Sequence, residues 1–265
     1  MVTEMLSNQM AEVAGELAAL PRLLLGLDFD GTLAPIVSEP DHASMPDGTK
    51  NLLEALVARP GATVAVISGR SVDDLRTRVT QKAILAGNHG LEMLENGVHW
   101  RHPQAARYEA ALGAICHELA AEFRGIPGAL VEQKGLTASV HYRNATGADA
   151  LRMSKRVRSA LAPYDDSFLV RDGSKVIEIL PAVAWNKGSA MLHILARMRR
   201  GSDTKIGVCY IGDDRTDEDA FVALTNAVTI RICQDCATAA RFRVENRTQA
   251  VDFLARIAQG AIVPR

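Results

Sequence analysis

The segment LLLGLDFDGTL, residues 23–33, joins an apolar run to two carboxylates and a glycine turn. A continuous apolar run such as Leu23–Leu27 is typical of a parallel strand that is buried on both faces. Asp and Gly are also ordinary turn residues after a strand, so a capped turn is one interpretation of Asp28–Gly31. The other is a site, because Asp28 and Asp30 point to the same side of an extended chain.

Strands and helices alternate on both sides of this segment, which predicts an α/β fold: a doubly wound, Rossmann-like parallel sheet. The predicted strands are Leu23–Phe29, Thr63–Ile67, Ala83–Ala86, Ile206–Ile211, Val228–Ile232 and Phe242–Val244. The predicted helices are Met1–Leu20, Pro46–Arg59, Ser71–Val79, Asn186–Arg200, Asp217–Leu224 and Thr248–Ile257. Ser71 has the residue type and position of a helix N-cap.

The pattern changes in the middle of the chain, where hairpin signals accompany two helical patterns. We expect a hairpin in Leu91–Trp100, helices at Gln104–Phe123 and Ala148–Leu161, and strands at Leu130–Gln133, Thr137–Tyr142, Phe168–Arg171 and Lys175–Leu180. Asp172-Gly173 is the strongest turn signal between the last two strands. These elements predict a smaller α+β domain, residues 103–180, inserted between core segments 1–102 and 181–265.

Composition excludes several classes of protein. Of 265 residues, 48% are hydrophobic and 23% are charged, which rules out a disordered or collagen-like chain. The net charge of −1 provides no general attraction to nucleic acid or to a membrane surface. No segment approaches the ~18–20 apolar residues of a membrane span, and Met1–Leu20 lacks the basic start of a secretory signal. We therefore expect a cytoplasmic monomer with neither nucleic acid nor membrane as a partner.

Two of the four cysteines are close in sequence. Cys233-x-x-Cys236 follows a predicted strand, as a thioredoxin-type redox motif would. A structural zinc site would need a second pair of ligands, and Cys116 and Cys209 are not so paired. We interpret all four as incidental thiols of a reducing compartment, with a redox role as the alternative.

Polar side chains gather where the predicted parallel strands end, and such ends share one edge of a sheet. They are Asp28, Asp30, Thr32, Ser68, Arg70, Asn88, His89, Asp213 and Asp214, with Gly69 between Ser68 and Arg70 and with Lys187 in the first turn of a helix. Converging carboxylates repel one another unless a cation joins them, and oxygen ligands without a His/Cys cluster favour Mg²⁺. Carboxylates with Mg²⁺, Lys and Ser suit a phosphoryl group, which one carboxylate can attack while a second transfers the proton.

The same residues resemble the motifs of the haloacid-dehalogenase-like phosphatases. Asp28–Thr32 is similar to their first motif, Ser68 to the second, Lys187 to the third and Gly212–Asp217 to the fourth. The resemblance implies that Asp28 is the nucleophile and Asp30 the general acid/base. It also implies that Ser68 and Lys187 bind phosphate and that a magnesium ion is held by Asp28, Asp30, Asp213 and Asp214.

Longer matches resemble the trehalose-6-phosphate phosphatases: residues 33–36 (LAPI), 67–70 (ISGR), 87–90 (GNHG), 140–143 (VHYR) and 212–221 (GDDRTDEDAF). This resemblance spans about 23–254. It implies a mobile cap over the sugar, with substrate-binding residues Thr32, Gly69, Arg70, Asn88, His89, Glu132, Lys134, His141, Arg143, Lys175 and Glu178. The expected reaction is hydrolysis of trehalose 6-phosphate to trehalose and phosphate through an aspartyl-phosphate.

Other interpretations stay open at this point. The substrate could be a glucosyl- or mannosyl-3-phosphoglycerate or sucrose 6-phosphate, or the chain could be an idle sugar-phosphate-binding regulator. Asp217 and Glu218 could hold a metal, support its ligands or cap a helix. His89 and His141 could be structural histidines.

Overall fold

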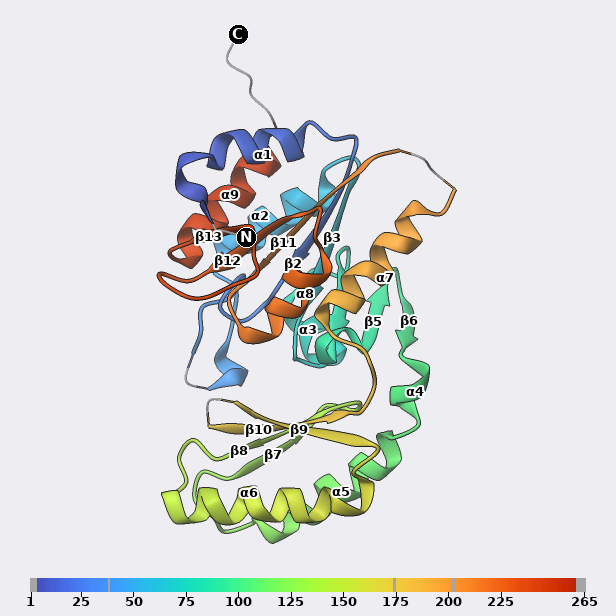
Figure 1. Cartoon of the computed structure of the whole chain (residues 1–265), viewed down its shortest axis with the longest axis vertical. Coiled ribbons are helices and arrows are strands. Elements are labelled where there is room, and N and C mark those ends of the chain that lie inside the picture. Colours follow the sequence, from blue (N-terminus) through green and yellow to red (C-terminus); the bar gives the residue numbers. More distant parts are fainter. Residues whose placement is uncertain (1–3, 38, 174, 202–203, 261–265) are drawn as a thin grey trace. The chain divides into compact units, whose positions relative to one another are not determined.

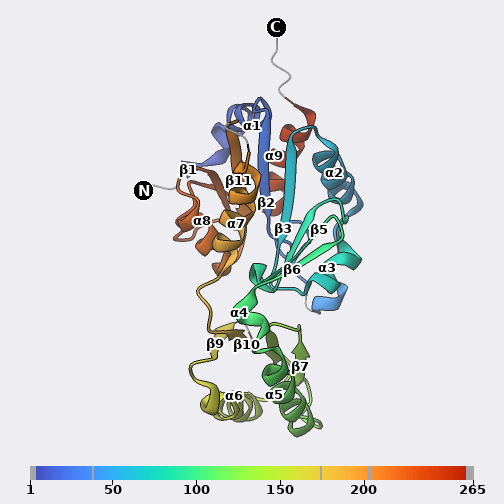
Figure 2. The ribbon, with the colours of Figure 1, turned by 90° about the vertical axis from the view of Figure 1, so that its right-hand side faces the viewer.

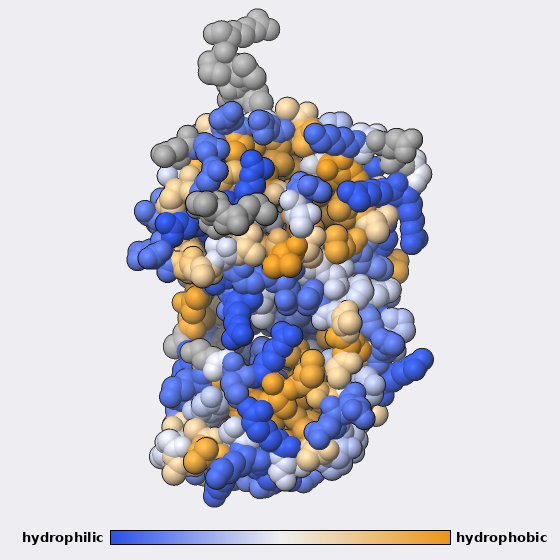
Figure 3. All heavy atoms as spheres, in the orientation of Figure 1, coloured by the Kyte–Doolittle hydropathy of each residue, from blue (hydrophilic) through white to orange (hydrophobic). Residues whose placement is uncertain are grey.

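The computed structural model describes residues 4–37, 39–173, 175–201 and 204–260. The chain divides into two compact units, the first formed by 1–99 and 185–265 and the second by 100–184. In the part of the chain described, each helix is too short or too polar to cross a membrane. Figure 3 shows one face of the molecule, on which hydrophilic residues surround hydrophobic patches in both units.

A single large sheet forms the centre of the first unit (Figures 1 and 2). The described residues give it nine strands in the order β1 (Glu4–Met5), β13 (Phe242–Val244), β12 (Val228–Ile232), β11 (Ile206–Gly212), β2 (Arg22–Leu27), β3 (Ala62–Ile67), β4 (Ile84–Gly87), β5 (Glu92–Glu95) and β6 (Val98–Arg101). Neighbours from β1 to β4 run parallel, and β5 is antiparallel to β4. The central strand β2 therefore carries Asp28 at its carboxyl end, between β11 and β3.

Helices cover both faces of this sheet, which makes it doubly wound. On one face lie α1 (Met10–Ala18), α2 (Asp47–Ala58), α3 (Val72–Arg78) and α9 (Arg247–Gln259), whose apolar side chains join the strands in one buried cluster. On the other lie α7 (Lys187–Arg199) and α8 (Glu218–Ala223). Met191 of α7 packs so closely on β2 that a Cβ at Gly26 would lie 2.5 Å from its sulfur. Ser71 caps α3, accepting a hydrogen bond from the Asp74 amide at 3.1 Å.

The second unit is a four-stranded antiparallel sheet with its two longest helices on one face (Figure 1). Its order is β7 (Leu130–Gln133), β8 (Ala138–His141), β10 (Val176–Pro181) and β9 (Phe168–Gly173). Its helices are α4 (Pro103–Ala106), α5 (Glu109–Glu122) and α6 (Gly147–Leu161). Side chains of α5 and α6 pack on Val140, Ile177 and Ile179. Because side chains alternate along a strand, Ser139 and Glu178 belong to the opposite face.

The fold class predicted from the sequence is confirmed, and three local predictions are wrong. The expected single helix Gln104–Phe123 is two helices, because the amides of Arg107 and Tyr108 make tight three-residue turns that end α4. The hairpin between β9 and β10 does not turn at Asp172-Gly173, since both residues belong to β9, where Asp172 pairs with Ile177 and Gly173 pairs with Val176.

The third difference lies at the amino end of the chain, where a single helix over Met1–Leu20 was expected. Residues 1–3 lie outside the described residues. Glu4–Met5 forms β1 and pairs with β13, a short 3-10 turn follows, and only Met10–Ala18 is α-helical. By contrast, Asn96 and Gly97 both have positive φ, 50° and 79°, as the predicted hairpin between β5 and β6 requires.

Candidate active site

Asp28 and Lys187 form a buried ion pair at the carboxyl end of β2. Lys187 Nζ lies 2.6 Å from Asp28 Oδ1, and the side chains are 3% and 6% exposed. Asn186 caps α7 by accepting the Ser189 amide, which places Lys187 at the first residue of the helix. Burial raises the pKa of Asp28, and Lys187 opposes that effect while Asp217 and Asp213 add to it. Burial alone would lower the pKa of Lys187, but Asp217 and Asp28 raise it, so the amine stays charged.

Asp217 holds the other side of Lys187 and is fully buried. Its Oδ1 accepts hydrogen bonds from Lys187 Nζ at 2.7 Å and from the Tyr210 hydroxyl at 2.7 Å. Its Oδ2 accepts the Asp214 amide at 2.9 Å. Because both oxygens already accept from donors, we interpret Asp217 as a residue that positions Lys187. Tyr210 was missed by sequence analysis, because a tyrosine in an apolar strand resembles any core residue.

Asp213 supplies the carboxylate that best fits a cation. One carboxylate oxygen from each of Asp28, Asp213 and Asp217 lies within 4.8 Å of the others. Asp213 Oδ1 is a buried atom for which the described residues provide no hydrogen bond. Burial and the charge of Asp217 raise the pKa of Asp213 to about 6. The three carboxylates therefore form a group that could hold a metal ion.

Gly31 makes room for this arrangement. Its φ is +82°, which favours glycine, and a Cβ there would lie 2.0 Å from Asp213 Oδ2. Gly31 thus allows the loop of the first motif to approach the fourth motif. Thr32 lies in the same turn, and its Oγ1 is buried with no hydrogen bond from the described residues.

Asp30 lies outside the carboxylate cluster and pairs with Arg70. Arg70 Nε donates to Asp30 Oδ2 at 2.7 Å, and Arg70 Nη2 donates to Asp30 Oδ1 at 2.8 Å. The third nitrogen of Arg70 donates to Asp74 at 2.7 Å, and Asp74 also accepts from Arg78. A chain of alternating charges therefore runs from Asp30 along α3, and its arginines and Asp74 were not predicted to act together.

Ser68, Gly69, Asn88 and His89 meet where β3 and β4 end. The Ser68 amide donates to Ala86 O at 3.0 Å, and the His89 amide donates to Ser68 O at 2.8 Å. A Cβ on Gly69 would lie 2.9 Å from the His89 ring. Asn88 and His89 have positive φ values of 51° and 58°, a costly conformation for residues other than glycine. Such strain at the edge that carries Asp28 is typical of a site.

Asp214 of the fourth motif and Glu218, the residue that follows the motif, have other contacts. Asp214 is exposed, and its Oδ1 accepts the Arg215 amide at 2.6 Å as a helix cap. Glu218 accepts hydrogen bonds from Thr238 Oγ1 at 2.7 Å and from the Ala239 amide at 2.8 Å. The structure therefore does not bring Asp30, Asp214 or Glu218 into the carboxylate cluster.

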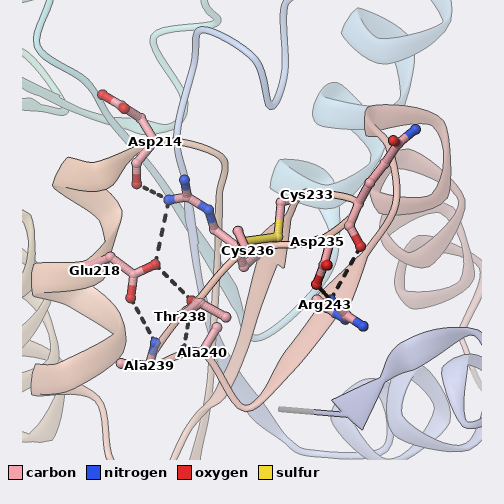
Figure 4. The surroundings of a disulfide bond; sticks show 11 residues. Asp214, Glu218, Cys233, Asp235, Cys236, Thr238, Ala239, Ala240 and Arg243 are labelled. Carbon is pink, nitrogen blue, oxygen red and sulfur yellow. Dashed lines mark hydrogen bonds and ion pairs between the residues drawn. A yellow bond between two sulfur atoms is a disulfide. The ribbon is translucent and has the colours of Figure 1, made fainter. Parts of the chain in front are cut away.

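The interpretation of Cys233 and Cys236 as incidental thiols is wrong, because the two form a disulfide (Figure 4). The free cysteines are Cys116 and Cys209, and both are buried. The x-x spacing permits this bond, but spacing alone did not distinguish it from a pair of thiols.

The remaining predicted substrate-binding residues, Glu132, Lys134, His141, Arg143, Lys175 and Glu178, lie in the second unit. Glu132 pairs across the sheet with Ser139, which pairs in turn with Glu178, so the three share the face opposite α5 and α6. Glu132 Oε2 lies 3.0 Å from His141 Nε2 and 3.5 Å from Lys134 Nζ. Burial would raise the pKa of Glu132, but His141 and Lys134 outweigh it and lower the pKa.

Arg143 and Lys175 are exposed and lie beyond the ends of β8 and β10. The Tyr142 amide donates to Lys175 O at 3.1 Å, which joins the two segments. The predicted site residues therefore form two groups, one in each unit.

Comparison with known proteins supports a single family. The family model for trehalose-phosphatase matches residues 26–250. A trehalose-phosphate phosphatase of Mycobacterium avium is 36% identical over 241 residues, 87% of this chain and 61% of that protein. A protein of Mycobacterium tuberculosis described as an uncharacterized glycosyl hydrolase is 38% identical over 90% of this chain and 19% of its own length.

The chain thus spans less than two thirds of the length of these curated relatives. Among solved structures, the C-terminal domain of a C. albicans trehalose-6-phosphate phosphatase has the same fold, with a TM-score of 0.76 and 22% identity. That likeness covers 98% of this chain and 99% of that one. With a family model that covers most of its length, the chain belongs to the trehalose-phosphatase family.

Proposed function

We propose that this chain is a Mg²⁺-dependent phosphatase that hydrolyses trehalose 6-phosphate to trehalose and phosphate. The observation that carries the proposal is the buried pair of Asp28 and Lys187 beside Asp213. A sugar-phosphate hydrolase needs a nucleophile, a cation against the phosphoryl oxygens and a site for a metal, and these residues supply all three. The family and the names of the relatives support the choice of substrate.

In the first step, Asp28 attacks the phosphorus atom, and its carboxylate forms an aspartyl-phosphate as the bond to the sugar oxygen breaks. Lys187 donates to Asp28 through Nζ, so the same ammonium group is placed to neutralise charge on the phosphoryl oxygens. Burial removes competing water from this pair and strengthens its electrostatic effect. Ser68 lies at the end of the neighbouring strand β3 and would hold another phosphoryl oxygen.

Asp30 would transfer the proton in both steps. It would protonate the leaving sugar oxygen and then accept a proton from the water that hydrolyses the aspartyl-phosphate. Arg70 donates to both oxygens of Asp30, so it holds this carboxylate in a fixed orientation as a hydrogen-bond acceptor. Donation requires one of these bonds to loosen, because the protonated oxygen must direct its hydrogen to the sugar.

A magnesium ion, when bound, would neutralise the crowded carboxylates and polarise the phosphoryl group. Asp28 and Asp213 are the residues we assign to hold it. The sequence-based set also contained Asp30 and Asp214, which stay candidates. Asp217 keeps Lys187 in place, because Lys187 Nζ lies between Asp217 Oδ1 and Asp28 Oδ1.

We propose that the second unit, roughly residues 103–180, is a cap that selects the sugar. Glu132, Lys134, His141 and Glu178 offer donors and acceptors on one face of its sheet, as recognition of sugar hydroxyls requires. Arg143 and Lys175 would add positive charge toward the phosphate.

Phosphate release from a panel of sugar phosphates tests the proposal. The panel contains trehalose 6-phosphate, sucrose 6-phosphate, glucose 6-phosphate, and glucosyl- and mannosyl-3-phosphoglycerate, each with Mg²⁺ and with a chelator. We expect strong preference for trehalose 6-phosphate, lost on chelation. Turnover of another member would overturn the assigned sugar, and binding without turnover would favour a regulator.

A further inference from the structure

We infer that Cys233 and Cys236 form a thiol–disulfide exchange site, and that its redox state alters Mg²⁺ binding through Glu218. The inference rests on the metal site of the proposed function, but not on the identity of the sugar. Its reaction partner is a small dithiol or a protein with a vicinal dithiol.

The disulfide lies in the loop between β12 and β13, beside the loop of the fourth motif (Figure 4). The Cys233 amide donates to Val244 O at 2.9 Å, which ties the first cysteine to β13. Both cysteines are partly exposed, and the inference requires that a dithiol reach their sulfur atoms. Arg243 pairs with Asp235, within the ring that the disulfide closes, at 3.1 Å.

Glu218 connects this loop to the carboxylates. Its two oxygens accept from Thr238 and Ala239, two and three residues after Cys236. Glu218 is also the first residue of α8 and follows Asp217, which holds Lys187. A movement of residues 236–239 would therefore pull on the segment that carries Asp213 and Asp217.

Arg231 makes a second connection from the same strand end. It donates to the backbone carbonyl of Asp214, and its Nη1 lies 3.6 Å from Glu218 Oε1. Arg231 is two residues before Cys233, so residues 213–218, here called the metal loop, are held by contacts on both sides of the disulfide. A contiguous set of hydrogen bonds and ion pairs of this kind can couple a change at the disulfide to the neighbouring carboxylates.

The exchange reaction is balanced by the dithiol itself. A thiolate of the dithiol attacks one sulfur, the Cys233–Cys236 bond breaks, and a mixed disulfide forms. The second thiol of the reductant then closes its own disulfide, and the protein gains two electrons and two protons as two thiols. Cys116 and Cys209 do not compete, because both are buried, and burial raises the pKa of Cys116 to about 11 and that of Cys209 further.

Oxidation closes a short ring over residues 233–236 and restricts the loop that Glu218 holds. Reduction frees that loop. Ordering the loop on Glu218 then costs more conformational entropy, and the metal loop is held less firmly. We expect the reduced protein to bind Mg²⁺ about fivefold more weakly, the lower end of typical coupling between sites.

The first measurement tests whether the Cys233–Cys236 disulfide exchanges with a dithiol. Thiols are counted by alkylation on the unfolded chain. After equilibration of the folded protein in mixtures of oxidised and reduced dithiothreitol, we expect two alkylated cysteines in the oxidised form and four in the reduced form. Two thiols after equilibration of the folded protein with reduced dithiothreitol, and four only when the chain is unfolded in the same reductant, would place the disulfide out of reach and overturn the exchange site. Four thiols at every potential would do the same.

Calorimetric titration with MgCl₂ then compares the two forms without any substrate. The Cys233→Ser/Cys236→Ser variant should bind like the reduced form and ignore dithiothreitol. Thr238→Val is the matched control: it keeps both cysteines and the metal loop but removes one hydrogen bond to Glu218, so its redox response should shrink. Equal Mg²⁺ affinity of wild-type protein in both forms would refute the coupling. Because these readouts need no turnover, a failed sugar-phosphate panel would leave this inference standing.

Discussion

Arg70 donates hydrogen bonds to both carboxylate oxygens of Asp30, with donor–acceptor distances of 2.7 Å and 2.8 Å. The side chain of Arg70 is 11% exposed and that of Asp30 is 41% exposed, so the pair lies at the edge of the buried cluster. This geometry fixes the proposed acid/base group while leaving one side open to solvent.

Arg70→Lys should lower kcat for phosphate release by about tenfold to a hundredfold with little change in KM. Lysine keeps the charge but cannot bind both oxygens in one plane, so Asp30 would lose its orientation. Steady-state kinetics with Mg²⁺ measures the effect. Asp74→Asn is the control, because it leaves the Arg70–Asp30 pair in place, and its loss should be smaller. An equal loss in both variants would contradict the orienting role of Arg70.

Asp74→Asn should reveal an acid-sensitive contribution to stability. Burial would raise the pKa of Asp74, but Arg78 and Arg70 outweigh it and lower the pKa below its ordinary 3.8. A lowered folded-state pKa means that the stabilisation is present above about 3.8 and is lost as pH falls through the folded value.

Thermal unfolding of wild type and Asp74→Asn at pH 7 and at stepwise lower pH measures this contribution. The variant should melt at a lower temperature at pH 7, and the difference should narrow below pH 4. A difference in melting temperature that does not change with pH would show that Asp74 acts through neutral contacts instead.

The strand β2 and the group at its end could be predicted because each has a local signature. An apolar run ending in Asp28 marks a central parallel strand, and Lys187 follows a helix cap of ordinary type. The role of Asp217 could not be predicted, because it depends on Tyr210 from β11 and on the backbone of Asp214. Those partners meet only after the sheet has formed.

Other features depended on small energy differences that residue types do not reveal. Asp172-Gly173 lies in β9 and not in the expected turn, because Gly173 fits a strand pair as well as a turn. The pairing of β1 with β13 joins segments more than 230 residues apart, and no local pattern marks a two-residue strand. The domain boundaries at 102/103 and 180/181 and the roles of the site residues stay predictions.

Asp213→Asn should stabilise the metal-free protein while weakening its response to Mg²⁺. Burial and Asp217 raise the pKa of Asp213 to about 6, so its charge is unfavourable in the folded state. With a folded value above 3.8, the folded chain binds more protons, and wild-type stability should fall as pH rises from about 4 to about 6.

In a chelator at pH 7, we expect the melting temperature of Asp213→Asn to exceed that of wild type by about 2 °C or more. Added MgCl₂ should raise the wild-type value and leave the variant nearly unchanged. A variant that melts lower than wild type in chelator would mean that the Asp213 carboxylate stabilises the metal-free fold, which contradicts its assignment as a metal ligand with an unfavourable charge.

The most direct test of the account is phosphate release from trehalose 6-phosphate by Asp28→Asn and wild type, with thermal unfolding run on both. Asparagine has nearly the same shape but cannot form the aspartyl-phosphate, so we predict a loss of about 10³-fold or more in a protein that still folds. Turnover near the wild-type rate in a folded Asp28→Asn variant would contradict Asp28 as the nucleophile.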